Sequence, residues 1–366
     1  METDCKYYNY SNEFKLESGK VLPLLRIAYH TYGTYTNESK VIWVCHALTA
    51  NSNVFDWWNG LFGENFLFNP DEYFIVCANV LGSCYGTTGP LSINPETNEP
   101  YYHTFPEITI RDMVQTHELL RKHLHINKIY LLTGSSLGGQ QALEWSVSNP
   151  EIFENMVFIA SNARHSAWGI AFNQSQRSAI ATDCTWNENN ENAGINGMKV
   201  ARSIALLSYR NYYTYHKTQT DSDINKTSGF KACTYQDYQG EKLAKRFNAF
   251  SYWHLSQAMD SHNIARYRET AELALSKIKA RTLAVGVTSD ILFPPEEQKL
   301  VATYIKGAQY AEIDSLYGHD GFLIETEKLE QLFKDFLQLG QNQHLNLLEV
   351  KKNDSPEPSV ITTVRC

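Results

Sequence analysis

The sequence predicts an α/β protein with a mostly parallel, doubly wound sheet and an inserted helical cap. Three observations support this class. Short, continuously apolar runs recur along the chain, helical patterns lie between them, and one long polar and aromatic stretch interrupts the alternation. Strands that are buried on both faces of a parallel sheet read as unbroken apolar runs. Their alternation with helices indicates βαβ crossovers, which place helices on both faces of one sheet.

Six runs have the length and composition of buried strands. These predicted strands are residues 41–45, 73–80, 128–134, 155–160, 281–287 and 308–314. Helices are expected at 110–125, at 137–148, where Asn149-Pro150 ends the pattern, and at 325–339, where Gly340 follows. The first ~35 residues are expected to form extended strands with a turn at 17–20.

The segment 165–275 differs from the rest of the chain because it has no clear buried strand. Stretches such as 198–216 and 240–260 look helical, and loops are expected at 187–194 and around 218–228. Because this segment lies between two core strands, we predict a helical cap, or lid, inserted into a core formed by 1–164 and 276–340. We expect residues 341–366 to form a polar tail, in which 351–360 is expected to be disordered.

Composition and charge exclude several classes of protein. A formal net charge of -8 argues against nucleic-acid binding, which needs a basic face. No signal peptide is visible, and no apolar run approaches the ~18 residues of a membrane span. The seven cysteines form no C-x-x-C pair, so neither a zinc site nor a thioredoxin-type motif is suggested. No metal and no permanently bound cofactor are expected. We expect a reduced, cytoplasmic protein whose cysteines mostly fill space. For Cys84, which lies in a predicted loop, a role other than packing stays open.

The strongest motif is G-x-S-x-G at 134–138, between a predicted strand and a predicted helix. In α/β-hydrolases this motif presents a nucleophilic serine on a sharp, strained turn. Side chains two residues before and after the serine would collide there, so glycine is needed at Gly134 and Gly138. The alternative is a glycine-rich turn that only caps a helix. The flanking strand, the following helix and a third glycine favour Ser136 as the nucleophile.

The order of a triad in α/β-hydrolases is serine, then an acid, then histidine. Asp290 follows the strand at 281–287, and only His319 and His344 come after it. His344 lies in the polar tail, whereas His319 lies in a loop that can return to the serine. We therefore predict His319 as the general base and Asp290 as the group that orients it. Alternatives are Asp314 as the acid, a helix-capping role for Asp290, and a plain exposed loop for His319.

An oxyanion hole needs two backbone N–H groups. One should follow the nucleophile, and the other should come from the loop after an early strand. We assign them to Leu137 and to Leu48, which lies in the loop after the strand at 41–45. The competing interpretation is that His46 and Thr49 in this loop only shape a turn.

Several motifs together closely resemble homoserine O-acetyltransferases of the α/β-hydrolase type. They agree in order, and the resemblance covers roughly residues 10–340. The motifs are HALTAN at 46–51, NVLGSCYGTTGP at 79–90, FPEITIRDMV at 105–114, GSSLGGQQALEW at 134–145, ARHSAWGIAFNQSQRSAI at 163–180 and YGHDGFL at 317–323.

The resemblance implies an α/β-hydrolase fold and a ping-pong acyl transfer. Acetyl-CoA, the co-substrate, would acylate the serine, and the hydroxyl of L-homoserine would then remove the acetyl group. The product would enter methionine biosynthesis, and a homodimer formed through the cap is expected. Carried over by position, Arg202 would hold the substrate carboxylate, Tyr209 would assist it about two turns further along the helix, and Asp320 would hold the ammonium group. Without the resemblance, these three would pass as ordinary helix and loop residues.

Two motifs depart from the family pattern. The elbow has GSSLGG where GGSMGG is usual, and the early loop has HALTAN where HALTGD is common. Leucine in place of methionine preserves the backbone donor. Ala50 and Asn51 are expected to reshape the entrance for the acyl group or CoA, which concerns the identity of the acyl donor more than the mechanism. Four alternatives stay open: a succinyl-CoA-dependent transferase, a transferase that acylates serine or another alcohol, an esterase or amidase with the same triad, and a catalytically silent binding protein of the same fold.

Overall fold

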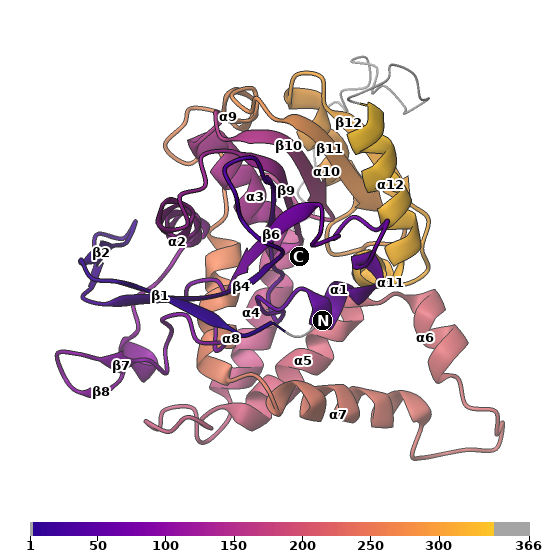
Figure 1. The fold of residues 1–366 in the computed structure, drawn as a ribbon. Coiled ribbons are helices and arrows are strands. Elements are labelled where there is room, and N and C mark those ends of the chain that lie inside the picture. The colour runs from indigo at the N-terminus through magenta and orange to yellow at the C-terminus, as the bar shows by residue number, and fades with distance from the viewer. Residues whose placement is uncertain (1–2, 340–366) are drawn as a thin grey trace.

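An eight-stranded sheet forms the centre of the protein, as the computed structural model in Figure 1 shows, and the structure describes residues 3–339. The strand order is β1-β4-β6-β5-β9-β10-β11-β12. Only β1 and β4 pair antiparallel with their neighbours. The strands of this sheet are β1 (Lys6–Tyr10), β4 (Leu25–Tyr32), β5 (Lys40–Cys45), β6 (Tyr73–Ala78), β9 (Ile129–Ser135), β10 (Phe153–Ile159), β11 (Arg281–Val287) and β12 (Gln309–Ile313). The predicted α/β class and mostly parallel sheet are confirmed.

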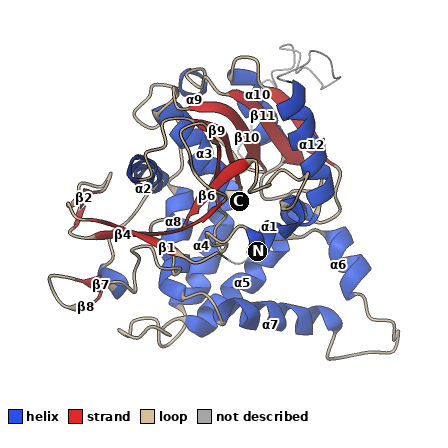
Figure 2. Cartoon of the chain, viewed as in Figure 1, coloured by secondary structure: helices blue, strands red, loops and turns tan. Residues whose placement is uncertain are grey.

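Helices cover both faces of the sheet, as Figure 2 shows. On one face, α2 (Ile110–His123), α3 (Leu137–Ser148) and α10 (Pro295–Tyr304) share a core with Val41 and Trp43. On the other, α1 (Phe55–Trp58) and α12 (Thr326–Leu339) share a core with Ile42 and Val44. Successive residues of β5 therefore enter opposite cores, which explains why the strand is apolar throughout. Two short hairpins, β2 (Phe14–Lys15) with β3 (Val21–Leu22) and β7 (Ile93–Asn94) with β8 (Glu99–Pro100), lie outside the sheet.

Between β10 and β11 the chain forms a run of helices, most of which lie below the sheet in Figure 1. They are α4 (Ala167–Ala181), α5 (Ile195–Tyr209), α6 (Tyr212–Gln219), α7 (Lys231–Ala244), α8 (Ala249–Asp260) and α9 (Ala271–Leu275). Helices α4, α5, α7 and α8 pack on one another, whereas α9 packs against α3 and α10 of the core. The predicted cap boundaries at 165 and 275 stay a prediction.

Two helical stretches expected from the sequence are each broken in the structure. The segment 198–216 divides between α5 and α6, because Arg210 is extended and the Asn211 side chain accepts the N–H of Thr214. The segment 240–260 divides between α7 and α8, where Asn248 accepts the N–H of Ser251. Asparagine at an N-cap replaces the hydrogen bond that the first turn of a helix lacks, so each of these residues starts a new helix.

The order of the strands creates a site at one edge of the sheet. From β5 the chain moves to β6 on one side and then crosses to β9 on the other. Parallel sheets bind ligands at the carboxyl ends of their strands, next to such a reversal. The segments that follow β5, β9, β11 and β12 therefore meet at this edge.

Within residues 3–339, no helix combines the length and the apolar character needed to cross a membrane. The predicted polar tail, and the rival residue His344 within it, lie outside the described residues.

Candidate active site

Ser136 occupies a sharp turn between β9 and α3. Its φ of 55° and ψ of -125° lie in a region that a residue with a side chain rarely adopts. Neighbouring groups hold this backbone in place: the N–H of Ser136 donates to the Ile159 carbonyl at 3.1 Å, and its carbonyl accepts the Ser161 hydroxyl at 2.6 Å. The elbow is therefore secured by the end of β10, the neighbouring strand, and by the residues that follow it.

The glycines around Ser136 are required sterically, as the sequence predicted. A Cβ at Gly134 would overlap the backbone of Gly138, and a Cβ at Gly138 would overlap the carbonyl of Cys45. A Cβ at Gly139 would lie 2.5 Å from the Ser161 side chain. Because Gly138 lies so close to Cys45, the first turn of α3 touches the end of β5.

His319 and Asp290 form a buried pair. His319 Nδ1 lies 2.6 Å from Asp290 Oδ2, and both residues are only 3% exposed. The other carboxylate oxygen, Oδ1, accepts the N–H groups of Leu292 at 2.8 Å and Phe293 at 2.9 Å. Asp290 thus stabilises the turn before α10 with one oxygen and orients His319 with the other.

The rival acid, Asp314, does not contact His319 among the described residues. Its carboxylate accepts the Thr288 hydroxyl at 3.3 Å. Asp314 follows β12 directly, and His319 turns away from it toward the end of β11. The geometry therefore favours Asp290 as the partner of the imidazole.

Aromatic rings surround the His319 imidazole. Phe293 stacks on it with the ring centres 5.1 Å apart, and Phe322 meets it edge-on at 5.2 Å. Tyr209 from α5 lies at 5.8 Å. These contacts limit rotation of the ring, so its Nε2 keeps one direction while Nδ1 is held by Asp290.

The loop after β5 is held by a neutral histidine. His46 Nε2 accepts the N–H of Val80 at 3.0 Å, so its proton must be on Nδ1, which lies 2.8 Å from the Ala47 carbonyl. Burial lowers the pKa of His46 to about 4, which keeps the ring uncharged at neutral pH. His46 therefore does shape this turn, as the competing interpretation held, and the turn belongs to the loop that carries Leu48.

Gln141 joins the two segments that were assigned to the oxyanion hole. Its amide donates to the His46 carbonyl at 3.2 Å and to the Leu137 carbonyl at 3.1 Å. Its own carbonyl lies 2.8 Å from Nε2 of the buried His117. Among the described residues, the N–H groups of Leu48 and Leu137 donate no hydrogen bond. They therefore remain available to an oxyanion.

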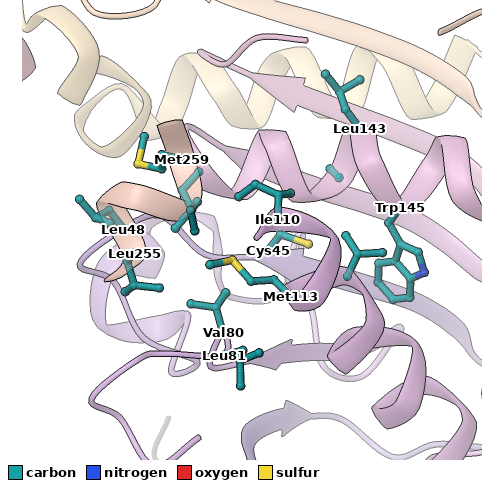
Figure 3. Close-up of a cluster of buried hydrophobic side chains, with 14 of the residues drawn as sticks. Cys45, Leu48, Val80, Leu81, Ile110, Met113, Leu143, Trp145, Leu255 and Met259 are labelled. Atoms are coloured by element: carbon teal, nitrogen blue, oxygen red, sulfur yellow. The ribbon is translucent and has the colours of Figure 1, made fainter. Parts of the chain in front are cut away.

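The cap also contacts this loop. Figure 3 shows the Leu48 side chain near Leu255 and Met259 of α8, within one buried hydrophobic cluster. Arg246, which lies between α7 and α8, donates to the Thr49 carbonyl at 2.6 Å. The position of the Leu48 N–H thus depends on the cap as well as on the core.

The predicted substrate residues gather beside His319. Arg202 lies over the Tyr209 ring, with its guanidinium carbon 5.3 Å from the ring centre. Asp320, next to His319, forms an ion pair with Arg210, whose Nε is 3.1 Å from Asp320 Oδ2. Burial raises the pKa of Asp320, and the positive charges of Arg210 and Arg202 act against that rise.

Three residues of this site were not predicted as site residues: Arg210, Gln141 and Arg246. Arg210 stands next to Tyr209, but nothing in the sequence relates it to Asp320, which is 110 positions away. Gln141 lies one helical turn after Leu137, and that spacing was the only local signal. Within residues 3–339, no group of three or more His, Cys, Asp or Glu side chains is placed to hold a metal ion.

The parallel sheet, the sharp turn at Ser136 and the buried pair of His319 and Asp290 together define an α/β-hydrolase. Residues 40–326 match the family described as alpha/beta hydrolase fold. A homoserine O-acetyltransferase of Cyclobacterium marinum is 49% identical over 322 residues, which cover 88% of this chain and 92% of the relative. The chain therefore belongs to the homoserine O-acetyltransferase family, as the motifs predicted.

Two solved structures show the same fold. The homoserine O-acetyltransferase from Bacillus anthracis superposes with a TM-score of 0.84 at 24% identity, over 95% of this chain and 100% of that one. Esterase E22 superposes with a TM-score of 0.82 at 22% identity, over 91% and 99%. At these identities the likeness concerns the fold, which transferases and esterases share.

Proposed function

We propose that this protein transfers an acetyl group from acetyl-CoA to the hydroxyl of L-homoserine, in the first step of methionine biosynthesis from homoserine. The observation that carries the proposal is the cluster of Arg202, Tyr209 and Asp320 beside His319. This cluster offers a cation and an anion within one site, as an amino-acid acceptor requires. Family membership supports the same reaction.

In the first half-reaction, His319 accepts the proton of the Ser136 hydroxyl while Oγ attacks the thioester carbonyl. The negative charge on the carbonyl oxygen is stabilised by the N–H groups of Leu48 and Leu137. The C–S bond then breaks, and the thiol of CoA leaves with the proton from His319. Asp290 holds Nδ1 of the imidazole, so Nε2 can accept and return this proton.

In the second half-reaction, the hydroxyl of homoserine takes the place of the departed thiol. His319 accepts its proton, its oxygen attacks the acyl-serine carbonyl, and the bond to Ser136 Oγ breaks. The proton then returns to Ser136. Arg202 would bind the acceptor carboxylate with its planar guanidinium, and Asp320 would bind the ammonium. Two charged anchors fix the hydroxyl for attack, which contributes much of the rate.

A transferase must keep water away from its acyl-serine. We assign this role to the helices inserted between β10 and β11. The site is already closely covered, since Ser136, His319 and Asp320 are 6%, 3% and 8% exposed. An esterase would instead admit water and release the free acid.

We also propose a homodimer formed through the cap. Exposed apolar side chains lie on neighbouring cap helices, and they are Val200, Leu207, Tyr212, Tyr213 and Tyr238. Burial of such a surface stabilises association. Leu207→Glu should convert a dimer to a monomer in sedimentation velocity, whereas an unchanged mass, or a wild-type monomer, would contradict this interface.

We also propose a cytoplasmic location, which the free thiols of the described cysteines support.

Mass spectrometry of the intact protein tests the reaction. Incubation with acetyl-CoA should add one acetyl group to wild type but none to Ser136→Ala, and L-homoserine should then remove it as O-acetyl-homoserine. Parallel incubations with succinyl-CoA and with L-serine separate the related transferases. Release of acetate, with no acylated amino acid, would identify an esterase. Acyl transfer at the wild-type rate by Ser136→Ala would refute the assigned nucleophile.

A further inference from the structure

Asp320 is a buried carboxylate with unused capacity for hydrogen bonds. Within residues 3–339 its side chain accepts no hydrogen bond, and its closest contact with Arg210 is an ion pair, with Oδ2 3.1 Å from an Nε that makes no hydrogen bond. The Asp320 side chain is 12% exposed and that of Arg210 is 20% exposed. The Asp320 oxygens are not sealed among protein atoms, so a ligand that enters the site can supply hydrogen-bond donors to them.

Arg210 reaches Asp320 because the end of α5 packs directly on the histidine loop. Gly318 has a φ of +62°, and a Cβ there would lie 2.9 Å from the carbonyl carbon of Arg210 and 3.0 Å from the Tyr209 carbonyl oxygen. The backbone of Arg210 is therefore fixed against the residue that precedes His319. From this position, its side chain extends to Asp320, and Nε lies 3.1 Å from Oδ2.

We propose that Arg210 is a positioning residue for recognition of the acceptor's ammonium group: it holds Asp320 as an anion and leaves Oδ1 for that ammonium. This inference rests on the proposed acyl transfer to homoserine. The ion pair draws Oδ2 toward Arg210 Nε, which leaves Oδ1 for the acceptor. The ammonium supplies the donors that the protein does not provide.

Arg202 and Arg210 have separate roles in this arrangement. Arg202 stacks over Tyr209 and keeps its guanidinium free of any carboxylate among the described residues, whereas Arg210 is engaged by Asp320. Arg202 is thus available for the carboxylate of the acceptor. Arg210 acts on the acceptor only through Asp320, so it is a positioning residue.

The charge of Asp320 depends on several surrounding groups. Those that face it from the packed elements are Arg202, Tyr209 and Arg210 of α5 and its end, Tyr215 of α6, Asp290 before α10, and the adjacent His319. Burial and Asp290 raise the pKa of Asp320, while the two arginines and His319 lower it. Removal of Arg210 therefore raises this pKa further, and a larger share of Asp320 is protonated at neutral pH.

The experiment compares two acceptors with the full-length enzyme. L-homoserine carries the ammonium, and 4-hydroxybutyrate has the same hydroxyl chain and carboxylate without it. Arg210→Met should raise the KM for homoserine by about 10- to 100-fold at pH 7, as expected for a lost charged contact. It should change turnover of 4-hydroxybutyrate by less than about threefold. The acid limb of kcat/KM for homoserine should shift to higher pH, and Arg210→Lys should restore most of the affinity.

Controls separate this role from a structural one. Acetylation of Ser136 by acetyl-CoA involves no acceptor and should proceed at the wild-type rate in Arg210→Met. Arg202→Met should weaken both acceptors, because both carry the carboxylate. An equal loss with both acceptors, loss of Ser136 acetylation, or an unchanged KM for homoserine would each overturn the proposal. Failure of the wild-type enzyme to acetylate homoserine would instead refute the proposed function, and the role of Arg210 with it.

Discussion

Replacement of Asp290 by asparagine should change the protonation pattern of His319 while leaving the backbone in place. The asparagine carbonyl can still accept the N–H groups of Leu292 and Phe293, which lie 2.8 and 2.9 Å from Oδ1. Its NH2 group then faces His319 Nδ1, where Oδ2 stood at 2.6 Å. Rotation of the amide would place the NH2 against two backbone donors, so the flipped orientation is disfavoured.

Because the NH2 group is a donor, His319 must present Nδ1 as an acceptor. The single proton of the neutral ring then moves to Nε2, the atom that should accept the proton of Ser136. A triad with this wrong tautomer loses about 10⁴-fold in rate, which corresponds to about 5.4 kcal/mol of transition-state stabilisation. The free energy of unfolding should fall by only about 1 to 2 kcal/mol, since one charge-assisted hydrogen bond is exchanged for a neutral one.

The assay is single-turnover acetylation of Ser136 by acetyl-CoA, paired with urea unfolding of each variant. Asp290→Ala should lose activity and also stability, by about 1–3 kcal/mol for each unpaired N–H group of Leu292 and Phe293. Asp314→Asn is the matched control, because Asp314 contacts Thr288 and not His319, and its rate should stay within about twofold of wild type. If Asp290→Asn retained more than a tenth of the wild-type rate, the assigned pairing would be wrong.

Three other outcomes are expected. In urea unfolding, Gly138→Ala should destabilise the protein by at least about 3 kcal/mol, because the added Cβ overlaps the Cys45 carbonyl. Gly229→Ala is the control: its φ is +63° and the space around it is open, so it should cost about 1 kcal/mol. Equal losses of stability in the two variants would contradict the close packing at the elbow. Burial of the Cys84 thiol raises its pKa to about 12, so this thiol should react slowly with iodoacetamide. After a brief treatment, mass spectrometry should find the exposed Cys184 and Cys233 alkylated and Cys84 unmodified. Rapid alkylation of Cys84 would show that its thiol is accessible. Burial lowers the pKa of five histidines from 6.5 to about 3 or 4, and they are His46, His117, His165, His254 and His262. Below pH 6.5 the unfolded state takes up protons that the folded state excludes, so the free energy of unfolding in urea titrations should fall by about 2 kcal/mol for each histidine at pH 5 and further toward pH 4. Equal stability at pH 7 and pH 5 would refute the neutral burial of these histidines.

Much of the fold could be predicted because its signals are local. The run at 41–45 lies within β5, whose side chains enter two cores in turn, and burial on both faces leaves an apolar sequence without alternation. The breaks at Asn211 and Asn248 were missed because the apolar pattern continues across them. Each asparagine outweighs that pattern through a single hydrogen bond to a backbone N–H.

The elbow was equally local, since Gly134, Ser136 and Gly138 act within one strand, turn and helix. Chain order narrowed the acid to Asp290 or Asp314 without deciding geometrically between them. That decision came from the loops that follow β11 and β12: the loop after β12 carries His319 back toward Asp290 and away from the nearer Asp314. The number of residues between an aspartate and His319 does not indicate which aspartate contacts it, because the order of the strands in the sheet determines which loops meet.

The sequence alone therefore determined the class of fold, the family and the candidate nucleophile, because strand burial, turn sterics and ordered motifs are written in neighbouring residues. Only the tertiary structure decided which groups surround those residues. Gln141 reaches His46 across 95 positions, and Arg210 reaches Asp320 across 110. Hydrogen bonds and ion pairs act over about 3 Å, so such partners leave no local pattern and become evident only when the folded chain brings them together.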